Sequence, residues 1–261
     1  MTIEPAARPV GVQLYSLRES LADDRPALFA RLAEVGFTVV EPYDVRTDPD
    51  SLRADLDAAG LVAHSAHVKL ASSAGPGEVA AAVDAVLTVG ARTLVVPRTE
   101  PQSWESADGV ASVAEHLAGV VDVAGEAGVN VAYHNHYWEA ARWADGRRGL
   151  DVFAEMAPAQ LSFQVDLYWA YVGGLDVPAL LGRLGERVHS VHVKDGPGTV
   201  AGDQVVLGHG STPLAPMLAA TRPEALRLLE IDRCAGPVLD MITENRRALA
   251  RLEAEGSEAG A

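Results

Sequence analysis

The stretch ARTLVVPRTEPQSWESADGVASVAEHLAGVVDVAGEAGVNVAYHNH, residues 91–136, contains two short apolar runs separated by a long amphipathic segment. The runs at 91–97 and 129–136 have the length and composition of buried strands. Between them, apolar residues from 107 to 128 recur at helical spacing. A strand, a helix and a second strand at this spacing predict two parallel strands of one sheet, joined by a crossover helix.

The same unit repeats along the whole chain. Further strands are predicted at 10–16, 37–41, 61–67, 161–166, 188–195 and 226–232. Further helices are predicted at 25–36, 48–60, 77–90, 148–157, 177–185, 214–221 and 236–256. Eight strand–helix units in about 250 residues predict an α/β fold, a single (β/α)8 TIM barrel. No linker divides residues 1–261, and the tail at 257–261 is expected to be disordered.

An open doubly wound sheet is the alternative fold for a chain with this alternation. That fold usually has a glycine-rich phosphate-binding turn after its first strand. The segment LYSLRES (14–20), which follows the first predicted strand here, contains no glycine. The closed barrel is therefore favoured.

Composition limits the partners and the location of the protein. Acidic residues outnumber basic ones by 36 to 21, a formal charge of −15, which disfavours a nucleic-acid partner. No apolar run is long enough to cross a membrane, and the opening MTIEPAARPV does not resemble a secretory signal. Cys234 is the only cysteine, so no intrachain disulfide forms and a cytoplasmic location is expected. Association into a homo-oligomer is left open, because no interface can be identified.

Polar residues close nearly every predicted strand instead of opening it. In a TIM barrel this carboxyl end of the strands carries the active site. The polar residues expected there are Gln13, Tyr15, Glu41, His67, Arg98, His134, His136, Asp166, His192, Lys194, Glu230 and Asp232. Alone, a histidine is usually structural and an acid usually caps a helix. Together, His134, Asp166, His192 and Glu230 on four successive strands form a set of two nitrogens and two oxygens that suits a divalent metal.

Five segments, in their order and spacing, resemble the xylose-isomerase-like barrel superfamily. They are GVQLYSLR (11–18), YHNHYWE (133–139), VDLYWA (165–170), VHVKD (191–195) and LLEID (228–232). The superfamily holds sugar-phosphate isomerases and epimerases, inosose dehydratases and isomerases, ketose 3-epimerases and the apurinic endonuclease IV group. The endonuclease reading is disfavoured, because Trp169 stands where that group carries a further histidine.

The resemblance implies one divalent ion (Mn, Mg, Co, Fe or Zn) held by four ligands. Asp166, His192 and Glu230 match the ligand positions directly. The fifth-strand position is usually a glutamate in the ketose epimerases and falls here on His134, which is our first choice as ligand. Glu139, five residues further on, is the alternative.

The expected function is that of an isomerase or epimerase acting on a sugar, keto-sugar or inositol derivative. The enzyme would abstract a proton next to a carbonyl and form a metal-stabilised enediolate. Glu230 is the expected base and His136 a second acid or base. Lys194 would balance the developing oxyanion or bind a phosphate, unless it pairs with Glu230 or Asp232. Substrate contacts are expected from Tyr15, Glu41, His67, Arg98 and Trp169.

Two other functions fit the same residues. One is a metal-dependent lyase or dehydratase acting on a 3-keto-glycoside or keto-inositol. The other is a non-catalytic barrel that binds carbohydrate. The loop at 195–213, which contains five glycines, is expected to border the pocket in any of these cases.

Overall fold

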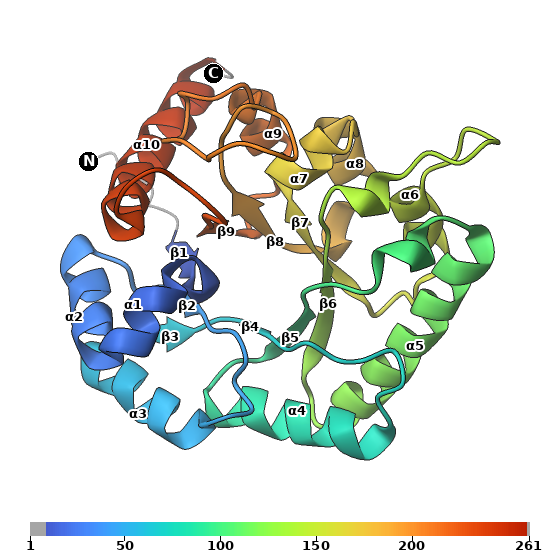
Figure 1. Cartoon of the computed structure of the whole chain (residues 1–261), viewed down its shortest axis with the longest axis horizontal. Coiled ribbons are helices and arrows are strands. Elements are labelled where there is room, and N and C mark those ends of the chain that lie inside the picture. The colour runs from blue at the N-terminus through green and yellow to red at the C-terminus, as the bar shows by residue number, and fades with distance from the viewer. Residues whose placement is uncertain (1–8, 260–261) are drawn as a thin grey trace, which may run out of the picture.

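The structure, a computed structural model, describes residues 9–259. Over these residues the chain forms one sheet with the strand order β3-β2-β1-β9-β8-β7-β6-β5-β4, and every strand pair is parallel. The strands are β1 (Val10–Gln13), β2 (Val39–Glu41), β3 (Val62–Ala63), β4 (Ala66–His67), β5 (Thr93–Val96), β6 (Asn130–His134), β7 (Ser162–Asp166), β8 (Val188–Val193) and β9 (Leu226–Leu229). The sheet curves into a barrel surrounded by helices (Figure 1), so the predicted TIM barrel is confirmed.

The barrel closes through the third predicted strand, 61–67, which is divided in two. Its first half, β3, pairs with β2, and its second half, β4, pairs with β5. Backbone contacts continue across the division, since the N–H of His64 donates to Val40 O and that of His67 to Pro42 O. One predicted strand therefore connects both edges of the sheet.

The helices cover the outside of the barrel with their apolar faces turned inward. They are α1 (Arg18–Asp23), α2 (Arg25–Val35), α3 (Pro49–Ala59), α4 (Pro76–Thr88), α5 (Ala107–Glu126), α6 (Gly149–Met156), α7 (Leu167–Val172), α8 (Val177–Leu184), α9 (Leu214–Ala220) and α10 (Val238–Ala259). Helix α5 illustrates the pattern, because its buried residues Val110, Val113, Ala114 and Leu117 follow helical spacing. Across residues 9–259, no helix combines the length and the apolar character that a bilayer crossing requires.

Several element boundaries differ from the predicted ones for local reasons. Strand β1 ends at Gln13, because the Gln13 side chain accepts from Tyr15 N and caps a 3-10 turn, Leu14–Leu17. Strand β7 leads straight into α7, because Asp166 Oδ1 accepts from Trp169 N and caps that helix. Helix α10 continues to Ala259, into the segment expected to be disordered, and residues 260–261 lie outside the described part of the chain.

Candidate functional site

Strands β6 to β9 each end in a side chain that can bind a metal. His134 closes β6, Asp166 closes β7, His192 lies near the end of β8, and Glu230 follows β9. Asp166 and His192 are direct partners in the register of β7 and β8. One ligand atom from each of the four buried residues lies within 4.8 Å of the others. The structure thus brings together the set that the strand ends predicted.

His134 has the state that a metal ligand needs. Its Nδ1 is buried without a hydrogen-bond partner, and its Nε2 lies 3.9 Å from Asp166 Oδ2. Burial holds the pKa of His134 well below its usual range, and the neighbouring His192 and His136 lower it further. The imidazole is therefore neutral and keeps a lone pair for a cation. Burial would lower the pKa of His192, but Glu230 and Glu41 raise it to about 10, so a divalent ion would take the place of one ring proton. With Asp166 and Glu230 as carboxylate donors, the four residues then fit a divalent ion.

Lys194 compensates the acidic side of the cluster. Its ammonium lies 2.8 Å from Asp166 Oδ2 and 2.8 Å from Asp232 Oδ2, and it also donates to Glu230 Oε2. Burial would lower the pKa of Lys194, but these carboxylates raise it well above its usual value. Lys194 is 1% exposed, so its positive charge compensates the three carboxylates and is not available to solvent. The sequence left this pairing open as the alternative to a substrate contact, and the structure shows the pairing with both Glu230 and Asp232.

Glu230 is ionised and keeps one oxygen available. Its Oε2 accepts from Lys194 and lies 2.8 Å from His192 Nδ1. Burial would raise the pKa of Glu230, but the charges of Lys194 and His192 hold it well below the usual value. Among the residues that the structure describes, no hydrogen bond reaches Oε1.

Glu41 lies beneath the cluster, in the polar interior of the barrel. Its Oε2 accepts from His192 Nε2 at 2.8 Å and from Gln13 Nε2 at 2.7 Å, while its Oε1 accepts from Gln164 Nε2 at 2.7 Å and from Ser65 Oγ. Burial would raise the pKa of Glu41, but His67 and His192 hold it well below its usual range. The glutamate is fully buried, so it contacts His192 instead of the cavity expected to hold a substrate.

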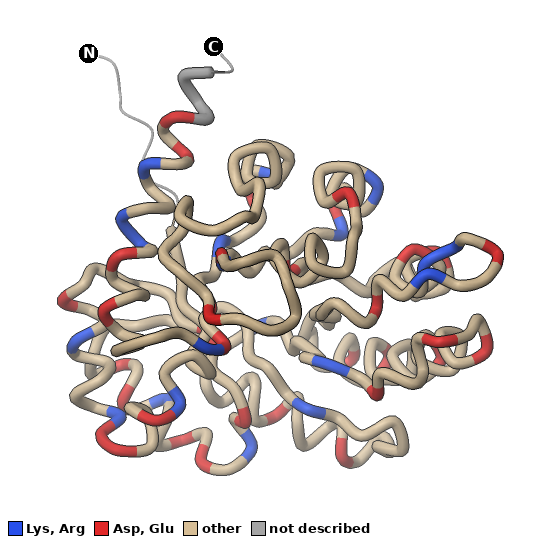
Figure 2. Tube along the Cα trace, turned by 45° about the horizontal axis from the view of Figure 1, so that its top comes forward, with Lys and Arg blue, Asp and Glu red and all other residues tan. Residues whose placement is uncertain are grey.

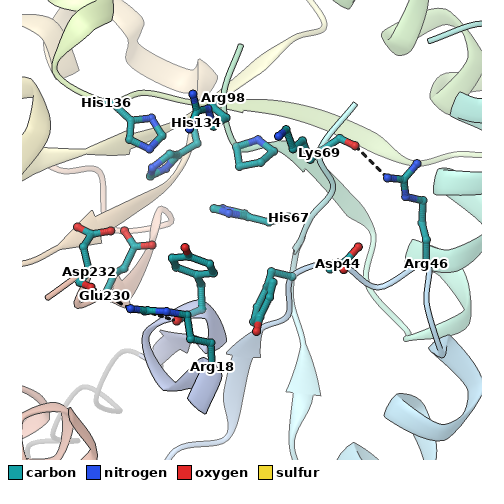
Figure 3. Close-up of a pocket in the computed structure, with 13 residues that line it drawn as sticks. Arg18, Asp44, Arg46, His67, Lys69, Arg98, His134, His136, Glu230 and Asp232 are labelled. Carbon is teal, nitrogen blue, oxygen red and sulfur yellow. Dashed lines mark hydrogen bonds between the residues drawn. The ribbon is translucent and has the colours of Figure 1, made fainter. Parts of the chain in front are cut away.

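A cavity of about 620 Å³ opens beside the cluster, at the carboxyl ends of the strands (Figure 3). Seven of the residues expected at this end of the barrel line its wall, namely Tyr15, His67, Arg98, His134, His136, Glu230 and Asp232. Trp169, expected to contact the substrate, is not part of the wall. Its ring instead lies against Lys194, with 5.6 Å between the ring centroid and Nζ. Arg18, Tyr43, Asp44, Arg46 and Lys69 also line the cavity and were not predicted. Lys69 had a usable signal, because it follows His67 by two residues and so shares its face.

Glu139 fixes the segment that carries His136. Its Oε2 accepts from His136 N at 2.9 Å and its Oε1 accepts from Tyr133 OH at 2.9 Å. Both oxygens are thus engaged, and Glu139 is absent from the described groups with metal-ligand geometry. This arrangement supports His134 over Glu139 as the fourth ligand. The His136 ring stacks on Trp138 with 4.2 Å between centroids and lines the cavity.

The loop at 195–213 is organised around Asp195. The Asp195 carboxylate accepts from the backbone N–H groups of Gly196, Gly208, Gly210 and Thr212. Gln204 reaches the site, because its Nε2 donates to Asp232 Oδ2 at 2.8 Å and its Oε1 accepts from Asp232 N at 2.7 Å. The loop therefore approaches the cavity through Asp232, a wall residue, although within the described chain residues 196–213 are not part of the wall.

Comparisons with known proteins agree with the barrel. The family model described as "Xylose isomerase-like TIM barrel" matches residues 29–225. A solved sugar phosphate isomerase/epimerase from Parabacteroides distasonis is 21% identical, with a TM-score of 0.80 and 95% of each chain covered. No curated protein sequence matches significantly.

Two further structures show the range of reactions among similar folds. An L-ribulose 3-epimerase is 15% identical, with a TM-score of 0.73 and 97% of each chain covered. A probable 3-DHS dehydratase from Bacillus anthracis is 12% identical, with a TM-score of 0.71, and the match covers 93% of this chain and 98% of that one. At these identities the likeness shows the fold alone.

Proposed function

We propose that this chain, which belongs to the xylose isomerase-like TIM barrel family, is a divalent-metal-dependent isomerase or epimerase of a keto-sugar or related polyol. Solved neighbours described as isomerase/epimerase and epimerase support an enzyme of this kind. One observation carries the proposal: His134, Asp166, His192 and Glu230 converge within 4.8 Å beside a cavity of about 620 Å³, which is large enough for a sugar or polyol.

The four converging residues would hold the ion. When bound, a divalent ion would polarise the carbonyl and neighbouring hydroxyl of a substrate as a Lewis acid. Lys194 keeps the surrounding carboxylates compensated, and Glu41 holds the ring of His192 from below. Metal-binding histidines commonly donate their second ring N–H to a carboxylate in this way.

Glu230 is the proposed base. It is ionised, it lines the cavity, and its Oε1 is free of hydrogen bonds within the described chain. It can therefore take the proton from the carbon next to the carbonyl, which leaves an enediolate. His136 lines the same cavity, and its Nδ1 has no hydrogen-bond partner. It would supply or remove a second proton, and Trp138 and Glu139 hold it in place.

Metal content tests the cluster. We expect about one divalent ion per purified chain, and loss of that ion in Asp166→Ala and His192→Ala, because each removes one of four ligands. The matched control is Asp84→Ala, which removes an exposed carboxylate from α4. Elemental analysis of the folded proteins measures the outcome. Equal metal in the wild type and both ligand variants would refute the site.

A dehydratase is the second candidate, favoured by the similarity to the probable 3-DHS dehydratase and by the presence of His136 beside Glu230. Both reactions begin with the same proton abstraction. In the dehydratase reaction, His136 would protonate a leaving hydroxyl group, so the product would have lost water. Mass spectrometry of the product separates the two. A chain that binds sugar but neither binds metal nor exchanges a substrate proton would be a carbohydrate-binding barrel.

A further inference from the structure

Two basic side chains in the cavity wall make no ion pair. Lys69 and Arg98 follow β4 and β5, which are neighbours in the sheet. Within the described chain neither has an acidic partner or a side-chain hydrogen bond, although both line the cavity. Figure 3 shows Lys69 across the cavity from Glu230 and Asp232, and Arg98 between Lys69 and His136 in this view.

The other cations around the cavity are already engaged. Arg18 donates to Tyr15 O and Asp232 O. Arg46 pairs with Glu78 at 3.3 Å and donates to Lys69 O at 3.1 Å. Asp44 also lines the cavity, but it forms no ion pair with Lys69 or Arg98. The positive charge that remains available to a ligand is therefore that of Lys69 and Arg98.

Arg98 is held in a defined orientation. Its guanidinium lies 5.4 Å from the ring centroid of Trp138, and Trp138 stacks on His136. The same ring thus positions a cation and a proposed proton-transfer group. A guanidinium fixed in this way can present two parallel N–H groups to a carboxylate or phosphate.

The two cations also mark a boundary. A second cavity, of about 560 Å³, shares Arg46, Lys69 and Arg98 with the first. Its other polar wall residues are Ser72, Glu78, Thr99, Glu100, Ser103, Ser112 and His116, and Glu78 pairs with Arg46. A group bound between Lys69 and Arg98 would thus lie where the two cavities meet. The chain carries a formal charge of −15, and Figure 2 shows acidic residues scattered over the outer helices and loops. Such a surface repels anions on average. Because Lys69 and Arg98 make no ion pair, they can attract an anion to this part of the cavity wall.

We propose that the substrate is a keto-sugar or keto-polyol that carries one anionic group, and that Lys69 and Arg98 bind this group. This proposal rests on the proposed function. A carboxylate and a phosphate ester share the required chemistry. The reactive carbonyl end would then face Glu230 and His136, and the anion would orient the molecule along the cavity.

Binding of small anions to the metal-free chain tests this subsite without knowledge of the substrate. The probes are inorganic phosphate and acetate, followed by NMR chemical-shift titration. We expect at least one of them to saturate the wild type, and the double variant Lys69→Gln/Arg98→Gln to bind it at least about ten-fold more weakly. The matched control is Arg31→Gln/Arg53→Gln, which removes two exposed arginine charges on α2 and α3 and should bind like the wild type.

Each outcome decides the proposal. Saturation by phosphate alone identifies a phosphate ester, and saturation by acetate alone identifies a carboxylate. The subsite would be overturned if neither phosphate nor acetate saturates the wild type. It would also be overturned if both double variants lose anion affinity to the same extent. Failure of the proposed function would be a different result. The metal-loaded chain would bind the anion but would exchange no proton of any keto-sugar.

Discussion

Glu41 is the carboxylate on which the orientation of His192 depends. It accepts from His192 Nε2 at 2.8 Å, while His192 Nδ1 faces Glu230. Glu41→Gln keeps the shape but can place an amide N–H against the imidazole, so we expect divalent-metal affinity to fall by about 10–100-fold. The visible absorption of bound Co²⁺ measures both the affinity and the ligand geometry. Glu139→Gln makes the same change in another fully buried glutamate and should leave the Co²⁺ spectrum unaltered. Wild-type affinity and spectrum in Glu41→Gln would contradict this role.

The sequence predicts which strand ends carry the site, but not how deep each side chain lies. Alternation assigns His192, Lys194 and Glu41 to the barrel interior. It does not predict that Lys194 contacts three carboxylates or that Glu41 is fully buried beneath His192. The depth of a side chain along the barrel axis depends on the stagger of the strands, which alternation does not give. Arg18, Asp44 and Arg46 come from segments without periodicity, so no pattern marked them as wall residues.

Gly210 is required by the loop that Asp195 organises. A Cβ at this position would lie 2.2 Å from Asp195 Oδ1 and 2.5 Å from Gly196 O. Gly210→Ala must therefore break the contacts around Asp195, and we expect it to destabilise the fold by about 1–3 kcal/mol. A Cβ added at Gly119 in α5 would meet nothing within 4 Å, so Gly119→Ala should be neutral or stabilising by up to about 1 kcal/mol. Urea unfolding compares the two, and equal stability of both variants would refute the packing argument.

Element boundaries show where local side-chain chemistry overrides the apolar pattern. The first strand was predicted to continue to residue 16, but the Gln13 side chain turns the chain at Tyr15. The third strand was predicted as one piece, yet β3 and β4 pair with different neighbours because the barrel must close there. Neither effect changes the period of the apolar residues, so the eight-unit alternation sufficed to predict the barrel but not these details.

His189 makes the stability of the whole barrel depend on pH. Burial, together with the neighbouring His64 at 4.9 Å between ring centroids, lowers the pKa of His189 to about 4. Because the folded pKa is below the usual 6.5, the unfolded chain takes up the proton first as pH falls. Stability is therefore complete above pH ~6.5 and declines toward pH ~4, by about 3 kcal/mol from this group.

Urea unfolding of the metal-free chain at several pH values checks this expectation. His189→Asn keeps a polar group beside Thr93, which His189 contacts at 3.0 Å, but removes the titration. The variant should lose less stability than the wild type between pH 7 and pH 4.5. Parallel curves for the two proteins would show that His189 titrates normally in the fold.

Proton exchange by the metal-loaded enzyme tests the central claim most directly, namely that Glu230 removes a proton from a metal-bound keto-sugar. The measurement is NMR-detected deuterium incorporation next to the carbonyl, in deuterated water, over a panel of ketoses, keto-sugar acids, ketose phosphates and keto-inositols. We predict exchange on at least one member by the wild type, and a fall of about 100-fold or more in Glu230→Gln with metal retained, because the glutamine lacks the basic lone pair. A metal-saturated Glu230→Gln enzyme that exchanges the proton at the wild-type rate would contradict the account.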